Sequence, residues 1–418
     1  MRILIVHQFY LDRGEGGGSR FNQFARYWVQ AGHEVTVVCG QVHYATGRKR
    51  DRFRGKWCVR ETDPESGATL LWCHVSESYF KGFWGRFWAF ICFAFSGTWA
   101  ALFRARRPDI IIATSPPLTV TAVAAVTSWL KWVPWVFEIR DLLPDGYIDM
   151  GKLTNPVLIR VGYFLEWLGH RASRHVNCLT PAFVRYIIER KGVPPGKTSM
   201  IPNAADLDLT RPGPRDNWVR KEYGLGDKFV VTYVGAHGPA NKLSQMLDAA
   251  ERFKDDGGLV FLLVGDGAEK KDLEADAARR GLTNVCFVPP QSKQTIGDFI
   301  AASDVCTAVL ARIDTFKTVY PNKVFDYMAC ARPIILAIDG VARELVEAAE
   351  AGLYVEPEQP EEFCAAVTRL RQSPDLCQAM GRKGEAYVRE HFSRDRLAGE
   401  YLALLEKLLR RGKETRGA

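Results

Sequence analysis

Short apolar runs alternate with amphipathic helical patterns along the whole chain of 418 residues. The runs are continuous rather than interrupted at every second position, which is typical of parallel strands that are covered on both faces. In the first half, the pattern predicts helices over 19–31, 83–105, 117–130, 156–171 and 181–190, between strands at "RILIV", "EVTVVC", "TLLWCHV", "DIIIAT", "PWVFEI", "HVNCLT" and "TSMIPN".

The same alternation restarts after residues 208–228, a stretch rich in proline, glycine and charge that is typical of a linker. We therefore expect an α/β protein with two doubly wound, Rossmann-like domains over 1–205 and 206–392, followed by a helix in 393–418 that packs back on the first domain. The second-half helices are predicted over 241–254, 268–280, 293–302, 321–331 and 341–350, between strands at "FVVTYVG", "LVFLLVG", "NVCFVP", "VCTAVL" and "PIILAI".

The composition is ordinary for a soluble globular protein, with 47% apolar and 25% charged residues. A net charge of +8 favours anionic partners. The ten cysteines include no C-x-x-C pair and accompany no histidine cluster, which argues against a disulfide framework or a zinc site. A reducing, cytoplasmic location is therefore expected.

The stretch "TVYPNKVFDYMACARPII", residues 318–335, places a cation and a carboxylate on one face of a predicted helix. Pro321 suits the first helical turn, and the N–H groups of Asn322 and Lys323 then lack partners within the helix. Together with the Lys323 ammonium they predict a pocket for a diphosphate, while Asp326 suits ribose hydroxyls. The alternative interpretation is a local surface ion pair.

Three glycine-bearing turns, in "QFYLDRGEGGGSRF", "VGAHGPANK" and "VGDG", follow predicted strands and offer further donor-binding candidates. In "QFYLDRGEGGGSRF", Gly17 and Gly18 would let backbone N–H groups approach an anion, unless the loop is merely flexible. In "VGAHGPANK", His237 and Lys242 could contact phosphate or sugar, although a lone loop histidine is as often a plain surface residue. No acidic residue clearly ends the second strand, which argues against a nicotinamide cofactor.

The segment "PWVFEIRDLLPD" places charges directly after a buried strand of the first half. Such charges are costly unless they are paired or used. Glu138, Arg140 and Asp141 are therefore the catalytic candidates, and the alternative interpretation is an ion network among the same three side chains.

Two segments suggest contact with a membrane surface. Residues 48–60, "RKRDRFRGKWCVR", carry seven basic residues and one acidic residue, which would favour an anionic leaflet. Residues 87–103 contain no charge but several tryptophan and phenylalanine residues. Three alternatives remain open for 87–103: a helix buried in the domain, a helix that dips into the leaflet, and a true membrane span.

Taken together and in order, seven segments resemble those of family 4 retaining glycosyltransferases of the GT-B fold, close to the WbuB/WcaI-like group of bacterial surface-polysaccharide enzymes. The resemblance runs nearly end to end. The segments are "HQFY…GGGSRFNQFARYWVQAGHEVTVVCG", "RPDIIIATSPPL", "FEIRDLLPD", "YVGAHGPANKLSQMLDAA", "VGDG", "PNKVFDYMACARPI" and "AGLYVEPEQPEEF".

The resemblance implies two domains that face a cleft, a sugar nucleotide held mainly by the C-terminal domain, and no metal or cofactor. Asp326 falls on the second acidic position of an E-x7-E motif, whereas Thr318 occupies the first. An Arg-plus-Lys pair for the diphosphate falls on Ala236 and Lys242, so only its lysine is present. Arg140 replaces a histidine of many relatives and is expected to stabilise the leaving diphosphate.

The same resemblance implies transfer with retention, from a UDP-sugar that often carries an N-acetylated amino sugar, to a polyprenyl-diphosphate-linked saccharide in surface glycan or lipopolysaccharide assembly. It implies a cytoplasmic protein that is peripheral, or monotopic, at the inner membrane, and no nucleic-acid partner. Two other functions stay open at this point. They are a sugar-nucleotide 2-epimerase on a similar frame and a non-catalytic GT-B binding subunit.

Overall fold

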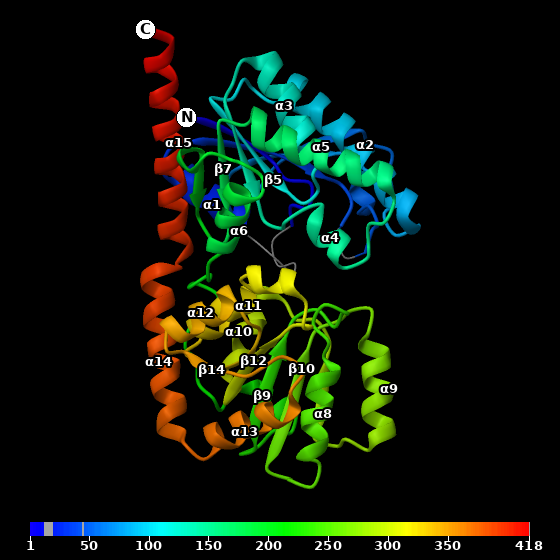
Figure 1. The fold of residues 1–418 in the computed structure, drawn as a ribbon, viewed down its shortest axis with the longest axis vertical. Coiled ribbons are helices and arrows are strands. Elements are labelled where there is room, and N and C mark those ends of the chain that lie inside the picture. Colours follow the sequence, from blue (N-terminus) through cyan, green and yellow to red (C-terminus); the bar gives the residue numbers. More distant parts are fainter. Residues whose placement is uncertain (12–19, 44–45, 418) are drawn as a thin grey trace. The chain divides into compact units, whose positions relative to one another are not determined.

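The structure is a computed structural model that describes residues 1–11, 20–43 and 46–417, and it divides into two compact units. The N-terminal unit contains the residues up to Pro202 together with those from Asp395 onward, and the C-terminal unit is Asn203–Arg394. Each unit is built around one sheet (Figure 1).

The N-terminal sheet has eight strands in the order β3-β4-β2-β1-β5-β6-β7-β8. The order reverses between β1 and β5, so their carboxyl ends form the topological switch point where doubly wound sheets bind ligands. The strands are β1 (Arg2–Val6), β2 (Glu34–Gly40), β3 (Cys58–Thr62), β4 (Thr69–Cys73), β5 (Ile110–Ser115), β6 (Trp135–Ile139), β7 (His175–Cys178) and β8 (Thr198–Met200).

Strand β3 corrects the expectation of a wholly parallel sheet, because it pairs antiparallel with β4. The connection between the two strands is short and closes through a turn in which Asp63 N–H donates to the Ala68 carbonyl at 2.8 Å. A connection of that length cannot make a parallel crossover, so the two strands form a hairpin. The polar pattern of 58–62 did not predict a strand.

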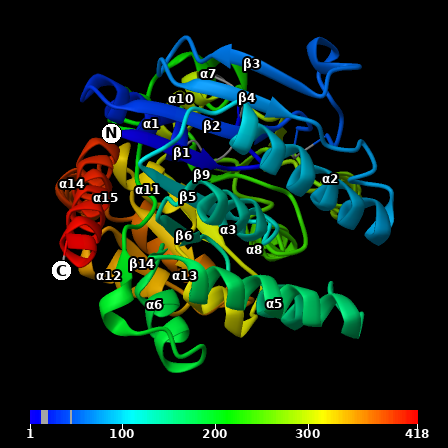
Figure 2. The ribbon, with the colours of Figure 1, turned by 90° about the horizontal axis from the view of Figure 1, so that it is seen from above.

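Helices α2 (Gly82–Phe103), α3 (Val120–Lys131) and α5 (Pro156–Ala172) lie side by side in the N-terminal unit (Figures 1 and 2). Because all three are right-handed crossovers in the same direction along the sheet, they cover the same face. Helix α1 (Arg20–Gln30) crosses in the opposite direction and covers the other face. Helices α4 (Asp145–Asp149) and α6 (Pro181–Glu189) complete the unit.

The N-terminal part of α15 (Arg394–Gly417) packs on α1. The Trp28 indole N–H donates to the Ala398 carbonyl at 2.9 Å, and the buried Tyr401 ring contacts Phe21, Phe24 and Trp28. From Asp395 the helix therefore belongs to the N-terminal unit, although the residues before it belong to the other unit.

The C-terminal sheet has six parallel strands in the order β11-β10-β9-β12-β13-β14, and its switch point lies between β9 and β12. The strands are β9 (Phe229–Val234), β10 (Leu259–Val264), β11 (Val285–Val288), β12 (Val305–Val309), β13 (Ile334–Ala337) and β14 (Gly352–Tyr354). The helices are α7 (Trp218–Glu222), α8 (Ser244–Arg252), α9 (Lys270–Arg280), α10 (Lys293–Ala301), α11 (Asn322–Ala329), α12 (Val341–Ala348), α13 (Pro360–Arg371) and α14 (Pro374–His391).

Candidate functional site

In the C-terminal unit, the turns after β9 and β10 pack backbone against backbone at the carboxyl edge of the sheet. The His237 N–H donates to the Asp266 carbonyl at 2.8 Å. A Cβ on Gly265 would lie 1.9 Å from the Gly235 carbonyl oxygen, and one on Gly267 would lie 2.3 Å from the His237 carbonyl oxygen. The glycines of "VGAHG" and "VGDG" are therefore required by this close packing, whatever the turns bind.

The Lys323 side chain lies between these turns and the start of α11. Its Nζ sits 3.7 Å from the centre of the Tyr233 ring, and a Cβ on Gly235 would lie 2.8 Å from the same Nζ. Within the described residues Lys323 forms no ion pair and no hydrogen bond. Burial lowers its pKa to about 7. A partly buried ammonium without a counterion is costly, so the geometry leaves a position that an anion would stabilise.

The start of α11 adds backbone donors to that position. Pro321 precedes the helix, which corrects the expectation that it opens the first turn, and no side chain caps the end. The helix begins at Asn322, so the first backbone N–H groups have no acceptor within the helix. The local dipole and the Lys323 ammonium both favour an anion here.

One turn further along α11, Asp326 is a partly buried carboxylate without a hydrogen-bond partner in the described structure. Burial raises its pKa to about 6, and the nearby Asp206 carboxylate acts in the same direction, although Arg394 and Lys293 oppose it. A carboxylate in this state can accept hydrogen bonds from neutral hydroxyl groups. The structure thus places an unpaired cation and an unpaired carboxylate on one short helix.

The other two donor-binding candidates of this unit are His237 and Lys242. The first is buried within the protein, and the second is paired with another side chain. The His237 side chain is fully buried, neither ring nitrogen has a hydrogen-bond partner, and burial followed by the charge of Lys270 lowers its pKa to about 4. It is a neutral imidazole beneath the turns. Lys242 forms an ion pair with Glu358, a residue that the sequence analysis did not single out.

Thr318, which occupies the first acidic position of the E-x7-E motif, forms a hydrogen bond within its own segment. Its hydroxyl donates to the Thr315 carbonyl at 2.6 Å within the short helix η3 (Asp314–Thr318). Gly17 and Gly18 lie outside the described residues. Among the residues that are described, no group of histidine, cysteine and acidic side chains is arranged to hold a metal ion.

In the N-terminal unit, Glu138 is a fully buried part of the scaffold. Its Oε2 lies 3.2 Å from Arg20 Nη2 and accepts a hydrogen bond from the Asn177 amide at 3.3 Å. Thr114 donates to Oε1 at 3.3 Å. Since every part of the carboxylate is enclosed by the protein, the structure favours a structural role over the predicted catalytic one. Its ionic partner is Arg20, rather than the neighbouring Arg140.

Arg140 and Asp141 lie at the carboxyl end of β6, as predicted, but the partner of Arg140 is unexpected. Arg140 Nη1 lies 3.3 Å from Nε2 of His7, the residue that follows β1. Burial, and then the charge of Arg140, holds the pKa of His7 well below its usual range, so His7 is the neutral acceptor. The Asp141 side chain is exposed. Sequence reasoning missed His7, although it directly follows a buried strand.

Two further residues that sequence reasoning missed support the donor pocket. Tyr233 supplies the ring beneath Lys323, and its hydroxyl donates to the Ala236 carbonyl at 2.9 Å. Tyr327, which is fully buried on α11, accepts a hydrogen bond from the Val234 N–H at 2.8 Å and so ties the helix to the end of β9. Both lie within apolar runs, and their roles depend on contacts that the local pattern does not reveal.

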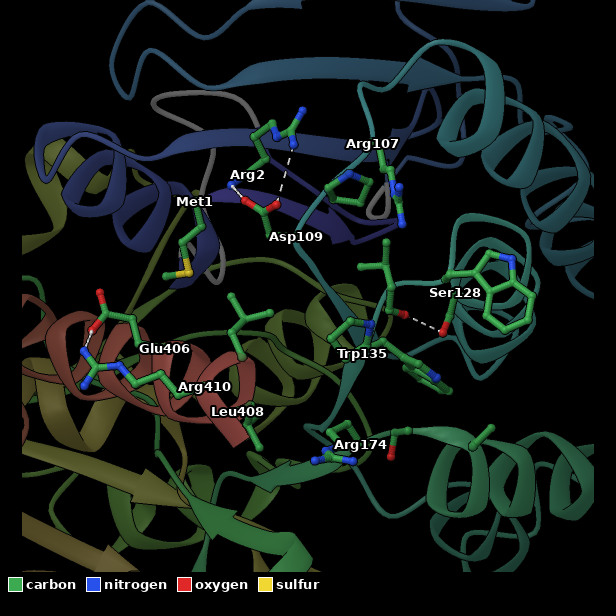
Figure 3. A pocket seen from close by; sticks show the side chains of 17 residues that line it. Met1, Arg2, Arg107, Asp109, Ser128, Trp135, Arg174, Glu406, Leu408 and Arg410 are labelled. Carbon is green, nitrogen blue, oxygen red and sulfur yellow. Dashed lines mark hydrogen bonds and ion pairs between the residues drawn. The ribbon is translucent and has the colours of Figure 1, made fainter. Parts of the chain in front are cut away.

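A hollow of about 1050 Å³ lies at the opposite edge of the N-terminal sheet, where the strands begin (Figure 3). Arg2, Arg107 and Arg174 line it together with Trp132 and residues of α15. Because doubly wound sheets bind their ligands at the carboxyl edge, this hollow is separate from the candidate catalytic groups.

Comparison with family profiles matches both halves of the chain. Residues 15–204 match the "Glycosyl transferase 4-like domain", and residues 215–387 match "Glycosyl transferases group 1". A protein of Escherichia coli K12 named as a colanic acid biosynthesis glycosyl transferase, WcaI, is 24% identical over 393 residues, covering 90% of this chain and 93% of that protein. The D-inositol 3-phosphate glycosyltransferase of Rhodococcus erythropolis is 30% identical, over 49% of this chain and 48% of its own.

Solved structures share the fold over nearly the whole chain. Anabaena Alr3699/HepE in complex with UDP superposes with a TM-score of 0.73 and 18% identity, covering 97% of this chain and all of that one. WaaG, a glycosyltransferase involved in lipopolysaccharide biosynthesis, superposes with a TM-score of 0.69 and 13% identity, covering 96% and 99% of the two chains. These similarities establish the GT-B fold that the sequence predicted.

Proposed function

We propose that this chain, which is a family 4 glycosyltransferase of the GT-B fold, transfers a sugar with retention. The donor is proposed to be a UDP-sugar, and the acceptor a polyprenyl-diphosphate-linked saccharide. The sugar is proposed to be an N-acetylated amino sugar, and the product a surface glycan. The observation that carries the proposal is the unpaired Lys323 ammonium beside the start of α11.

The donor half of this proposal rests on the chemistry of the pocket. Lys323 and the first N–H groups of α11 would hold the diphosphate, and Asp326 would accept from the ribose hydroxyls. Uridine is supported by the relatives of the same fold, because Alr3699/HepE has been solved with UDP and with UDP-glucose.

The transfer step is proposed to need no side-chain base. The bond from the anomeric carbon to the donor phosphate breaks as the acceptor oxygen attacks on the same face, and the acceptor proton passes to a phosphate oxygen of the leaving UDP. Arg140 is proposed to stabilise that leaving diphosphate, with neutral His7 orienting the guanidinium. Asp141 would orient the acceptor hydroxyl through its exposed carboxylate.

A route for a lipid-linked acceptor is supported by an aromatic cluster near the end of β1. Phe9, which lies two residues beyond His7, contacts Tyr79 and Phe90 at ring distances of 5.8 and 6.4 Å. Phe90 belongs to α2, and Arg86 of the same helix lies 5.1 Å from the Tyr79 ring. Among the described helices, α2 is long and apolar enough to cross a membrane by its length and composition. We propose that α2 lies along the cytoplasmic leaflet and does not cross the membrane.

The test is an assay of labelled UDP-N-acetylhexosamine with detergent-solubilised polyprenyl-diphosphate saccharide. The proposal expects label in the lipid phase and α-configured product. A new free sugar nucleotide would instead indicate a 2-epimerase, and the absence of any conversion with UDP-, GDP- and TDP-sugars would indicate a non-catalytic binding subunit. Either result would overturn the proposal.

A further inference from the structure

The exposed large apolar side chains of this protein are concentrated on three neighbouring helices. In the C-terminal unit, Trp218 is the one such residue among those described. By contrast, α2, α3 and α5, with the residue that ends α3, expose Trp84, Trp88, Phe95, Trp99, Phe103, Val126, Trp129, Leu130, Trp132, Val157, Val161, Tyr163, Phe164 and Trp167. A patch of this extent on a soluble domain marks an interaction surface.

The helices have two apolar sides, only one of which the protein covers. Ala89, Phe93 and Ala100 of α2 are fully buried, so that side of the helix packs within the unit. Trp129 on α3 is 71% exposed and Trp167 on α5 is 56% exposed, on the side that the unit leaves uncovered. Since α2 contacts α3 and α3 contacts α5, the uncovered sides form one continuous surface, here called the outer helical face (Figure 2).

The charged side chains that α2, α3 and α5 themselves carry are mostly basic. The acidic residue that these helices carry is Glu166, which is buried and paired with Lys191 at 3.0 Å. The carboxyl-terminal ends of the helices carry a basic rim, made of Arg104, Arg106, Arg107, Lys131, Arg171 and Arg174.

Two arginines of the basic rim point to a phosphate-bearing partner. Arg107 and Arg174 line the hollow of Figure 3, and neither side chain has an ion pair within the described structure. The acidic side chains of the same hollow, Asp109 and Glu406, are paired with Arg2 and Arg410. Ser173 also lines the hollow, and its buried hydroxyl has no hydrogen-bond partner. Guanidinium groups next to exposed tryptophan rings match the boundary between phospholipid headgroups and acyl chains.

We propose that the outer helical face docks on a bilayer that contains anionic phospholipids, with its aromatic side chains at the headgroup–acyl boundary and the basic rim on lipid phosphates. The inference deepens the proposed function, on which its biological purpose rests, because it names the surface that would bring the enzyme to a lipid-linked acceptor. The helices lie on the bilayer rather than across it, since a span by α2 would carry the sheet beneath it into hydrocarbon.

Vesicle flotation with the full chain tests the docking surface. Wild-type protein is expected to float with phosphatidylcholine vesicles that contain phosphatidylglycerol, and much less with phosphatidylcholine alone. The double variant Trp129→Glu, Trp167→Glu should lose at least tenfold in partitioning. The matched control Met200→Glu changes an exposed apolar residue on β8, which is not part of the three helices, and should float as the wild type does.

The basic rim is tested separately with Arg107→Ala and Arg174→Ala. Each should lower partitioning on anionic vesicles about fivefold, the equivalent of about 1 kcal/mol, and should have little effect on neutral vesicles. Unchanged flotation of the double tryptophan variant would overturn the proposal. The proposal would also be overturned if the wild-type protein did not bind vesicles but formed a dimer, and if the double tryptophan variant were monomeric. The outer helical face would then bind a second copy of the chain.

The outcome for docking is distinguishable from that for the proposed function. In detergent, where no bilayer is needed, the double tryptophan variant should transfer sugar at the wild-type rate. If no UDP-sugar supports transfer in detergent while flotation behaves as expected, the proposed function fails and the docking surface stands. If transfer is normal and flotation is insensitive to the variants, the docking surface fails alone.

Discussion

Two charged clusters at the carboxyl edges of the two sheets differ in how far the protein satisfies them. In the N-terminal unit, the Glu138 carboxylate is paired with Arg20 and accepts from two further side chains. In the C-terminal unit, Lys323 and Asp326 have no such partners in the described structure. Burial shifts the pKa of both toward neutrality.

This difference distinguishes charges that stabilise the fold from charges that are available to bind a ligand. A buried charge that is paired within the protein holds secondary-structure elements together, and removal of one partner leaves the other as an uncompensated buried charge. A charge that the protein leaves unpaired is costly in the free state, and its cost is relieved only when a ligand arrives. Sequence position alone does not make this distinction, because each cluster places a cation and a carboxylate a few residues apart within an apolar segment.

The largest expected effect is on stability, at Glu138. Replacing it with Ala leaves the buried Arg20 guanidinium without its counterion, and we expect the free energy of unfolding to fall by about 3–5 kcal/mol. Urea denaturation measures this change, and Glu138→Gln, which keeps the shape and part of the hydrogen bonding, should be milder. A Glu138→Ala protein of wild-type stability that had lost transfer would restore the catalytic interpretation.

The next effect is on catalysis, at Lys323. Replacing Lys323 with Ala removes the ammonium that is proposed to stabilise the diphosphate, and kcat/KM should fall by at least about 100-fold. Stability should not fall, because the residue removed is an unpaired, partly buried charge. Lys242→Ala serves as the control and should cost less than tenfold, since Lys242 is already paired with Glu358. Near-wild-type turnover of Lys323→Ala would show that the phosphate assignment is mistaken.

A smaller effect is expected at Asp326. Asp326→Asn keeps the shape of the side chain but weakens its hydrogen bonds to ribose by about 1.5 kcal/mol, so the Kd for UDP should rise about tenfold. The change should be much smaller for inorganic diphosphate, which has no ribose. Equal losses for both ligands would place Asp326 outside the ribose site.

A comparable effect is expected at Gly235, where φ is +146°. In Gly235→Ala, the added methyl group would lie 2.8 Å from Lys323 Nζ and would displace it. Calorimetric titration with UDP should show about a tenfold loss of affinity, accompanied by some loss of stability from the strained backbone. An unaltered affinity would mean that the position of Lys323 does not govern binding.

The sequence allowed prediction of most of the fold, because continuous apolar runs mark parallel strands. It did not predict β3, whose pattern is polar, or α13 and α14, for which no assignment was made. The charged residues were harder to interpret. Glu138 pairs with Arg20, 118 positions away, and Lys242 pairs with Glu358, 116 positions away. Such partners become visible only when the chain is folded, whereas Lys323 and Asp326 were identifiable because both lie on one short helix.

The central claim is that Lys323 has no ionic partner in the free protein and binds the diphosphate of the donor. The most direct test of this claim is whether a proton is taken up when UDP binds. Because its pKa in the free protein is about 7, Lys323 is mostly neutral at pH 8, and a bound diphosphate would raise that pKa. Calorimetric titrations at pH 8, in two buffers of different ionisation enthalpy, should therefore show uptake of nearly one proton. The uptake should vanish in Lys323→Met and at pH 6, where the wild-type ammonium is already formed. UDP binding at pH 8 without proton uptake, or unchanged uptake in Lys323→Met, would contradict the claim.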